Sequence, residues 1–164
     1  MKQGEVRRHE SDMPIDAAHV HLMLNHLPVI GAPFLLLLLT IGLWRGSREL
    51  VTISLVLVVG LAVATGLVYL TGEPAEELVE RASWFRDALA ESHEDQATVS
   101  LVAVLVTGAL ASAALAFRRR PAAGVWLPRV TWGALALSTI LLGWTAWSGG
   151  QIRHEEVRAS AIVR

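Results

Sequence analysis

The chain alternates between long apolar stretches and short polar segments. Four stretches of 18 to 21 residues contain no Asp, Glu, Lys or Arg: Leu27–Trp44, Leu50–Leu70, Ala97–Phe117 and Val130–Trp147. A bilayer core of about 30 Å needs about 20 helical residues at 1.5 Å per residue. Backbone groups in lipid must also form hydrogen bonds within their own segment, which favours helices. The pattern therefore predicts an all-α fold, an integral membrane four-helix bundle.

The polar ends of these stretches set the expected domain boundaries. We expect a polar N-terminal tail at 1–16, a single four-span domain at 17–158 and a C-terminal tail at 159–164. Asp16 is a favourable N-cap residue for the first span. The spans themselves are predicted at 17–44, 50–70, 94–117 and 129–148.

The segment between the second and third spans carries its own helical pattern. Glu73, Glu77 and Glu80 recur at helical spacing, and apolar residues occupy positions between and beyond them. This arrangement is typical of an amphipathic helix that lies on a membrane surface. We therefore predict a short surface helix over 73–91.

Charge is divided unequally between the two sides of the predicted bundle. The side that holds the loops 45–49 and 118–129 carries six Arg and one Glu, whereas the side that holds both termini carries eight basic and fourteen acidic residues. The raw count of basic residues favours the terminal side as cytoplasmic, but the density of Arg in the two short loops favours the other. We predict a multi-pass protein of the bacterial inner membrane with both termini in the periplasm, and no cleavable signal peptide is visible. The net charge of −1 gives no reason to expect a nucleic-acid partner.

All six histidines fall on the side of the termini. Counted along the helices, His21, His93 and His154 lie at nearly the same depth, and His26 lies about one and a half turns deeper. Ionisable residues inside a membrane are costly and mark functional sites by default. Acidic residues follow them in the sequence or occupy the adjacent loop, among them Glu77, Glu94 and Glu155.

Two kinds of site fit this set of residues. A b-type haem needs two histidines from different helices, and His26, His93, His154 and His21 are the candidates, with His26 first because it is deepest. A non-haem Cu, Zn or Fe ion would instead use His21, His26, His93 and His154 with Glu77, Glu94 or Glu155. A third alternative leaves the histidines at the interface as tolerated polar residues in a structural subunit without a cofactor. The chain contains no cysteine, which excludes thiolate ligands and disulfides.

A weak internal repeat also appears. The segment Gly66-Leu-Val-Tyr-Leu-Thr-Gly72 resembles Gly143-Trp-Thr-Ala-Trp-Ser-Gly149 in position and character. Each closes a helix pair that begins with a histidine, His26 in one half and His93 in the other. The repeat suggests two related hairpins around a twofold axis along the membrane normal, although coincidence accounts for so few identities equally well.

Four motifs resemble an uncharacterised bacterial family of four-helix inner-membrane proteins, over about residues 19–158. They are His21-Leu-Met-Leu-Asn-His26-Leu-Pro28, Thr71-Gly-Glu-Pro-Ala-Glu-Glu77, His93-Glu94 and Gly149-Gly-Gln-Ile-Arg-His154-Glu155. Related four-helix membrane domains with a His-Pro start are suspected of binding haem and sometimes occur beside cytochrome modules. The resemblance thus implies haem binding at His21, His26, His93 and His154.

These observations lead to one main functional expectation. It is a haem b-binding membrane redox protein, or an accessory electron-transfer subunit, with the cofactor near the periplasmic side. Its partners would be the lipid bilayer, a periplasmic cytochrome or a larger membrane complex, or a second copy in a homo-oligomer. No nucleophile elbow, phosphate loop or nucleotide motif is present, so no independent hydrolase or transferase activity is expected.

Overall fold

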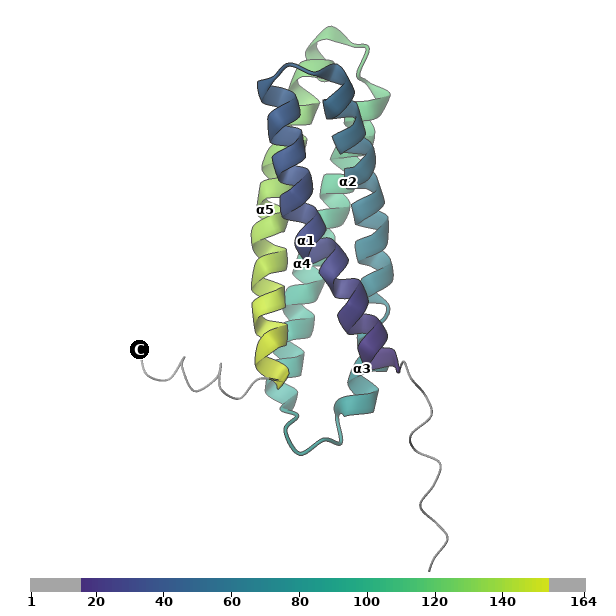
Figure 1. The fold of residues 1–164 in the computed structure, drawn as a ribbon, viewed down its shortest axis with the longest axis vertical. Helices are drawn as coiled ribbons and strands as arrows, with labels where there is room; N and C mark the ends of the chain where they lie inside the picture. Colours follow the sequence, from purple (N-terminus) through teal and green to yellow (C-terminus); the bar gives the residue numbers. More distant parts are fainter. Residues whose placement is uncertain (1–15, 154–164) are drawn as a thin grey trace, which may run out of the picture.

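A computed structural model describes residues 16–153, and this part of the chain is helical apart from its turns. Its elements are α1 (Ala17–Trp44), α2 (Arg48–Tyr69), α3 (Gly72–Val79), α4 (Asp87–Ala116) and α5 (Pro121–Arg153). Four of them form one long antiparallel bundle, and the short α3 lies at the end from which α1 starts (Figure 1). The all-α four-helix prediction is confirmed.

The neighbour relationships define a ring of helices. α1 packs against α2 and α5, and α4 packs against the same two helices, so α1 and α4 stand diagonally across the bundle. α3 packs on α1. Chain direction alternates from each long helix to the next, which leaves α1 and α4 parallel (Figure 1).

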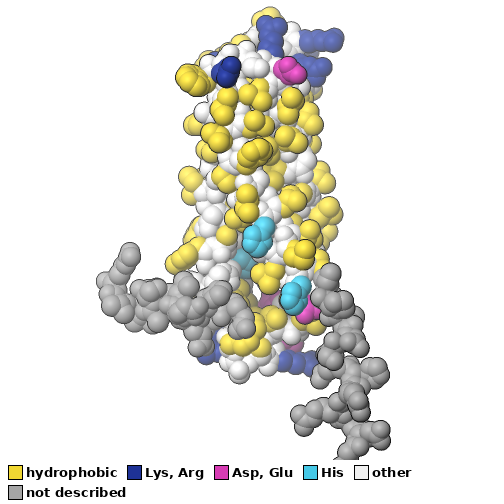
Figure 2. Space-filling view, in the orientation of Figure 1, with side chains coloured by type: hydrophobic (Ala, Val, Ile, Leu, Met, Phe, Trp, Pro, Cys, Tyr) yellow, Lys and Arg dark blue, Asp and Glu magenta, His cyan; other side chains and the backbone are white. Residues whose placement is uncertain are grey.

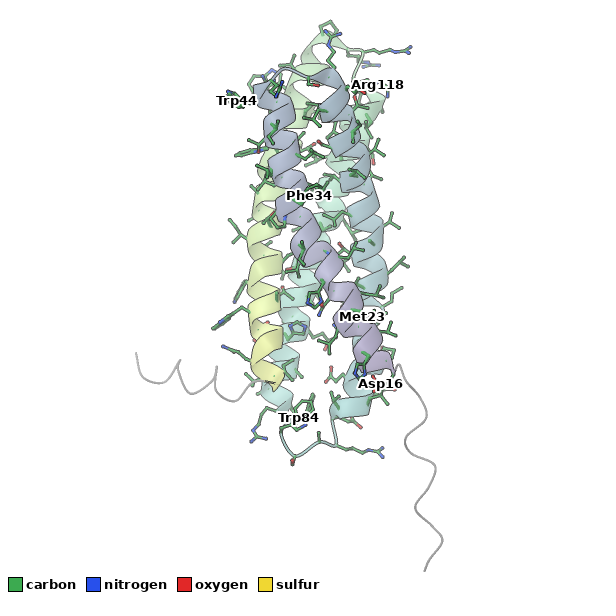
Figure 3. All side chains as sticks on the ribbon, viewed as in Figure 1. Asp16, Met23, Phe34, Trp44, Trp84 and Arg118 are labelled. Atoms are coloured by element: carbon green, nitrogen blue, oxygen red, sulfur yellow. The ribbon has the colours of Figure 1, made fainter. Side chains whose placement is uncertain are left out.

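Four helical stretches within residues 16–153 are long and apolar enough to cross a membrane. Hydrophobic side chains cover the length of the bundle, and charged ones gather at its two ends (Figure 2). Trp44 and Arg118 mark one end, whereas Asp16 and Trp84 mark the other (Figure 3). This distribution is that of a multi-pass membrane protein.

The helix ends differ from the predicted boundaries in several places, among them the end of α5, which runs to Arg153 rather than to 148. The segment predicted as one surface helix is divided: α3 ends at Val79, the chain turns, and the residues from Asp87 onward belong to α4. Phe85 is buried in that turn, which holds the chain against the bundle. At the other end, α5 begins at Pro121 rather than at 129, because the fixed φ of proline suits the first position of a helix.

Small and hydroxyl-bearing residues fill the interior between the helices. Gly108 of α4 lies so close to α2 that a Cβ built on it would be 2.5 Å from the Cβ of Ala62. Thr107 of α4 and Ser138 of α5, both fully buried, share a hydrogen bond of 3.0 Å. Close backbone approach and interhelical hydrogen bonds are the usual means of helix association in lipid, where apolar burial gives no driving force.

Candidate functional site

His21 is held at the point where α2 gives way to α3. Its Nδ1 lies 2.8 Å from Oγ1 of Thr71, the residue directly before α3. The Thr71 hydroxyl donates its own hydrogen to the Val68 carbonyl at 2.6 Å, so its oxygen must accept from the imidazole. His21 therefore carries its proton on Nδ1.

His93 is held in the same manner by α5. Its Nδ1 lies 3.1 Å from the Thr145 carbonyl oxygen and 3.1 Å from Oγ of Ser148. The Ser148 hydroxyl donates to that same carbonyl at 2.9 Å, so it too accepts from the ring. The backbone of Gly149 lies against the imidazole and leaves no room there for a side chain. His93 likewise carries its proton on Nδ1 and keeps a lone pair on Nε2.

Both rings therefore present an unprotonated Nε2. Neither Nε2 has a hydrogen-bond partner within residues 16–153, and neither is enclosed by protein, so each borders space for at least a water molecule. Imidazoles whose Nδ1–H is fixed by an acceptor and whose Nε2 is open are the usual form of a metal-ligating histidine.

The helical phase of each histidine explains why these two face the interior. His21 lies seven residues before Pro28, the first buried residue of α1, and His93 lies seven residues before Ser100, on the buried stripe of α4. Seven residues are almost two full turns, so each histidine lies on the same face as the buried stripe of its helix. His26 is two residues before Pro28, about 200° around α1, and faces outward.

The structure accordingly places the remaining predicted ligands elsewhere. His26 is exposed, with its Nδ1 2.6 Å from the Leu22 carbonyl of its own helix, and His19 is exposed beside Asp16. Glu77 and Glu94 are exposed at the α3 end of the bundle. His154 and Glu155 lie outside the described residues. On the face shown in Figure 2, the visible histidines lie in the half of the bundle nearer that end.

A further polar group accompanies His93 on the interior face of α4. Gln96 follows it by three residues, and its side-chain nitrogen donates to Oγ of Ser92 at 3.2 Å. Its oxygen, Oε1, is buried and has no hydrogen-bond partner among residues 16–153. A buried acceptor without a donor is rare in folded proteins and points to a group that completes it, such as a bound ligand or water.

The two halves of the chain build equivalent surroundings for the two histidines. Thr71 and Ser148 occupy the same position in the two similar heptapeptides, as do the carbonyl-bearing Val68 and Thr145. Gly72 and Gly149 follow the hydroxyl residues and face Cε1 of His21 and His93 respectively. The histidine equivalent to His93 is thus His21 and not His26, the one that the sequence repeat suggested.

The buried positions repeat in the same register. Each of the five buried residues of α1 has a buried counterpart 72 positions later in α4; the pairs are Pro28/Ser100, Ala32/Val104, Leu35/Thr107, Leu39/Ala111 and Gly42/Ala114. The buried positions of any two bundle helices can be aligned in several registers that differ by one heptad. The offset of 72 residues is the one that also aligns His21 with His93. The hairpins α1–α2 and α4–α5 are therefore related by a pseudo-twofold axis along the bundle.

Sequence reasoning did not single out Thr71, Ser148 or Gly149 as part of the site. The repeated heptapeptide contained all three, but the repeat alone did not indicate which of its positions face an imidazole. Comparisons of the chain with protein-family models, with curated proteins and with solved structures find no match.

Proposed function

We propose that this protein is a membrane redox protein that binds one b-type haem between His21 and His93. The observation that carries the proposal is the pair of inward-facing imidazoles on diagonal helices, each with Nδ1 bonded to protein and Nε2 open. His21 and His93 would each supply one ligand nitrogen, and their equivalent surroundings in the two halves of the chain suit a group that is held by two like ligands.

The donor set favours haem over a non-haem ion. Zn and Cu sites in proteins need three or four ligands from the chain, whereas a bis-histidine haem needs two. Within the part of the chain that the structure describes, no three His, Asp or Glu side chains come together. The apolar bundle around the pair and the free acceptor on Gln96 are also compatible with an organic macrocycle that carries polar groups.

The protein itself would bind the haem and orient the imidazoles that hold it. Haem b would supply one-electron exchange when bound. His21 and His93 would hold the iron, and the hydroxyl and carbonyl acceptors behind them would set the ring orientation and raise ligand basicity. The helices would exclude bulk water and keep the site in a low dielectric, which influences the potential.

Absorption spectroscopy tests this proposal. We expect the full chain, purified in detergent and titrated with haem, to give a Soret band and sharp reduced bands of a six-coordinate low-spin haem. His21→Ala and His93→Ala should each abolish the low-spin spectrum. His19→Ala and His26→Ala are the matched controls and should retain it, because both side chains are exposed on the outer face of α1. Loss on His26→Ala with retention on His21→Ala would overturn the assignment, as would stoichiometric Cu, Zn or Fe in a protein that takes up no haem.

We further propose an inner-membrane location with the α3 end of the bundle in the periplasm. The supporting feature is the density of Arg at the opposite end, where Arg45 lies in a turn, Arg48 begins α2 and Arg129 lies near the start of α5. The absence of native cysteine makes the test direct. A membrane-impermeant maleimide applied to intact spheroplasts should label Ser83→Cys, in the turn after α3, and spare Ala122→Cys at the start of α5. The reverse pattern would invert the topology.

A further inference from the structure

Each inward-facing histidine is bonded to a hydroxyl that is itself bonded to a carbonyl three residues earlier. The relation holds for Thr71 with Val68 and for Ser148 with Thr145, on opposite sides of the pseudo-twofold axis. A hydroxyl has a single hydrogen, so committing it to a carbonyl leaves only acceptor capacity toward the imidazole. While the hydroxyl hydrogen stays on the carbonyl, neither arrangement can stabilise an unprotonated Nδ1, since the hydroxyl oxygen can then only accept.

We infer that the site consists of two equivalent half-sites, each made of one histidine and one hydroxyl residue. Thr71 is the positioning residue of the first half-site and Ser148 that of the second. Each fixes the Nδ1–H tautomer of its own histidine and thereby turns an Nε2 lone pair toward the bundle interior. The inference rests on the proposed function for the identity of the ligand, but the tautomer itself is a property of the ligand-free protein. Thr71 and Ser148 touch no ligand in this scheme and act through His21 and His93.

The two half-sites differ in how closely the neighbouring glycine packs against the imidazole. A Cβ on Gly72 would lie 3.8 Å from Cε1 of His21, which is an ordinary contact, whereas one on Gly149 would lie 2.8 Å from Cε1 of His93. His93 is thus wedged between the Gly149 backbone and its two acceptors, and His21 has some freedom on that side. We therefore expect the hydroxyl to matter more for His21, whose ring has fewer steric constraints.

Nitrogen-15 NMR of the histidine rings in ligand-free protein decides the question. In the parent protein, both rings should show a protonated Nδ1 and an unprotonated Nε2 near neutral pH. Thr71→Val should convert His21 to a mixture of tautomers and leave His93 unchanged, and Ser148→Ala should have the reciprocal effect. Thr71→Ser and Ser148→Thr, which exchange the residues of the two halves, should retain the parent spectrum because a hydroxyl is kept.

Matched controls come from hydroxyls on α2 and α5 that hydrogen-bond no histidine in the described part of the chain. There, Thr65 donates to Leu61 of its own helix, and Ser138 bonds to Thr107. Thr65→Val and Ser138→Ala should leave both histidine tautomers unchanged. If Thr71→Val and Ser148→Ala give ring spectra identical to those of the parent, the positioning role is wrong.

The haem titration separates this inference from the proposed function. Substitution of a residue that hydrogen-bonds a metal-ligating histidine typically weakens metal affinity about 10- to 100-fold, and we expect a loss of that size in haem affinity for Thr71→Val. If the parent protein binds no haem but its histidines show the predicted tautomers, haem is refuted as the ligand and the positioning role of Thr71 and Ser148 stands. If the parent protein binds haem but the histidine tautomers are unchanged in Thr71→Val and Ser148→Ala, the positioning role of the two hydroxyls is refuted and the haem assignment stands.

Discussion

The backbone of Gly149 lies against the imidazole of His93, with a virtual Cβ only 2.8 Å from Cε1 and 3.2 Å from Nδ1 of the ring. Real Cβ atoms essentially never approach a carbon this closely, so the ring keeps its place only because residue 149 is glycine. The ring cannot simply move aside, because Thr145 and Ser148 hold its Nδ1 from the same helix. Adding a single methyl group at residue 149 therefore tests whether the position of the His93 ring matters for haem binding.

Gly149→Ala should displace His93 and weaken haem binding, by about tenfold or more if the ring loses its acceptors. Gly72→Ala, at the equivalent position of the other half, is the control and should have little effect, since its Cβ would meet His21 at 3.8 Å. Haem titration of the two variants, with circular dichroism to verify folding, makes the measurement. Equal effects of the two substitutions would contradict the close packing at Gly149.

A second glycine controls how closely α2 and α4 approach. A Cβ on Gly108 would lie 2.5 Å from Cβ of Ala62, so Gly108→Ala must push the two helices apart. We expect a loss of about 1–3 kcal/mol of stability, the range typical of overpacked interiors. Gly60→Ala on α2 meets no atom within 4 Å and should change stability by less than about 0.5 kcal/mol. Unfolding in mixed detergent micelles compares them, and similar losses for both would argue against the contact.

The buried hydrogen bond between Thr107 and Ser138 joins α4 to α5 in the middle of the bundle. Thr107 also donates to Ala103 of its own helix, so it keeps a partner when Ser138 is changed. A double-mutant cycle with Thr107→Val and Ser138→Ala should give a coupling energy of about 0.6 kcal/mol, with about 1.7 kcal/mol as the upper end for membrane proteins. A coupling of zero in the same unfolding assay would show that the bond adds nothing to association.

The first turn of α1 should depend on pH through its N-cap. Asp16 accepts a hydrogen bond from the backbone N–H of His19 and another contact from the His19 ring, and these bonds lower the pKa of its carboxyl group. A lowered pKa means that this contribution to helix stability is present above the ordinary Asp value and is lost as the pH falls through the folded value. The protection of the first-turn amides against hydrogen exchange, measured relative to their intrinsic exchange rates, should therefore fall below about pH 4. Asp16→Ala should remove this pH dependence, and an unchanged acid response in that variant would assign it to another group.

The spans followed from the sequence alone, because lipid imposes a length and forbids charge in every stretch that crosses it. The ends were less predictable. Pro121 starts α5 eight residues before the predicted span, and the segment after Val79 turns back to bury Phe85 instead of continuing as a helix. The first outcome follows from the fixed φ of proline, whereas the burial of Phe85 depends on packing at the end of the bundle, where composition does not discriminate between helix and loop.

The sequence by itself determined that histidines from several helices lie near one end of an apolar bundle. Which of them face inward was decided by helical phase and by the partner helices. His26, the deepest, faces outward, and His21, five residues earlier, faces the interior on the same stripe as Pro28. Thr71 and Ser148 became part of the site only when α2 and α5 packed beside α1 and α4. A hydrogen bond between residues about 50 apart has no local sequence pattern, since its geometry exists only after the helices have assembled.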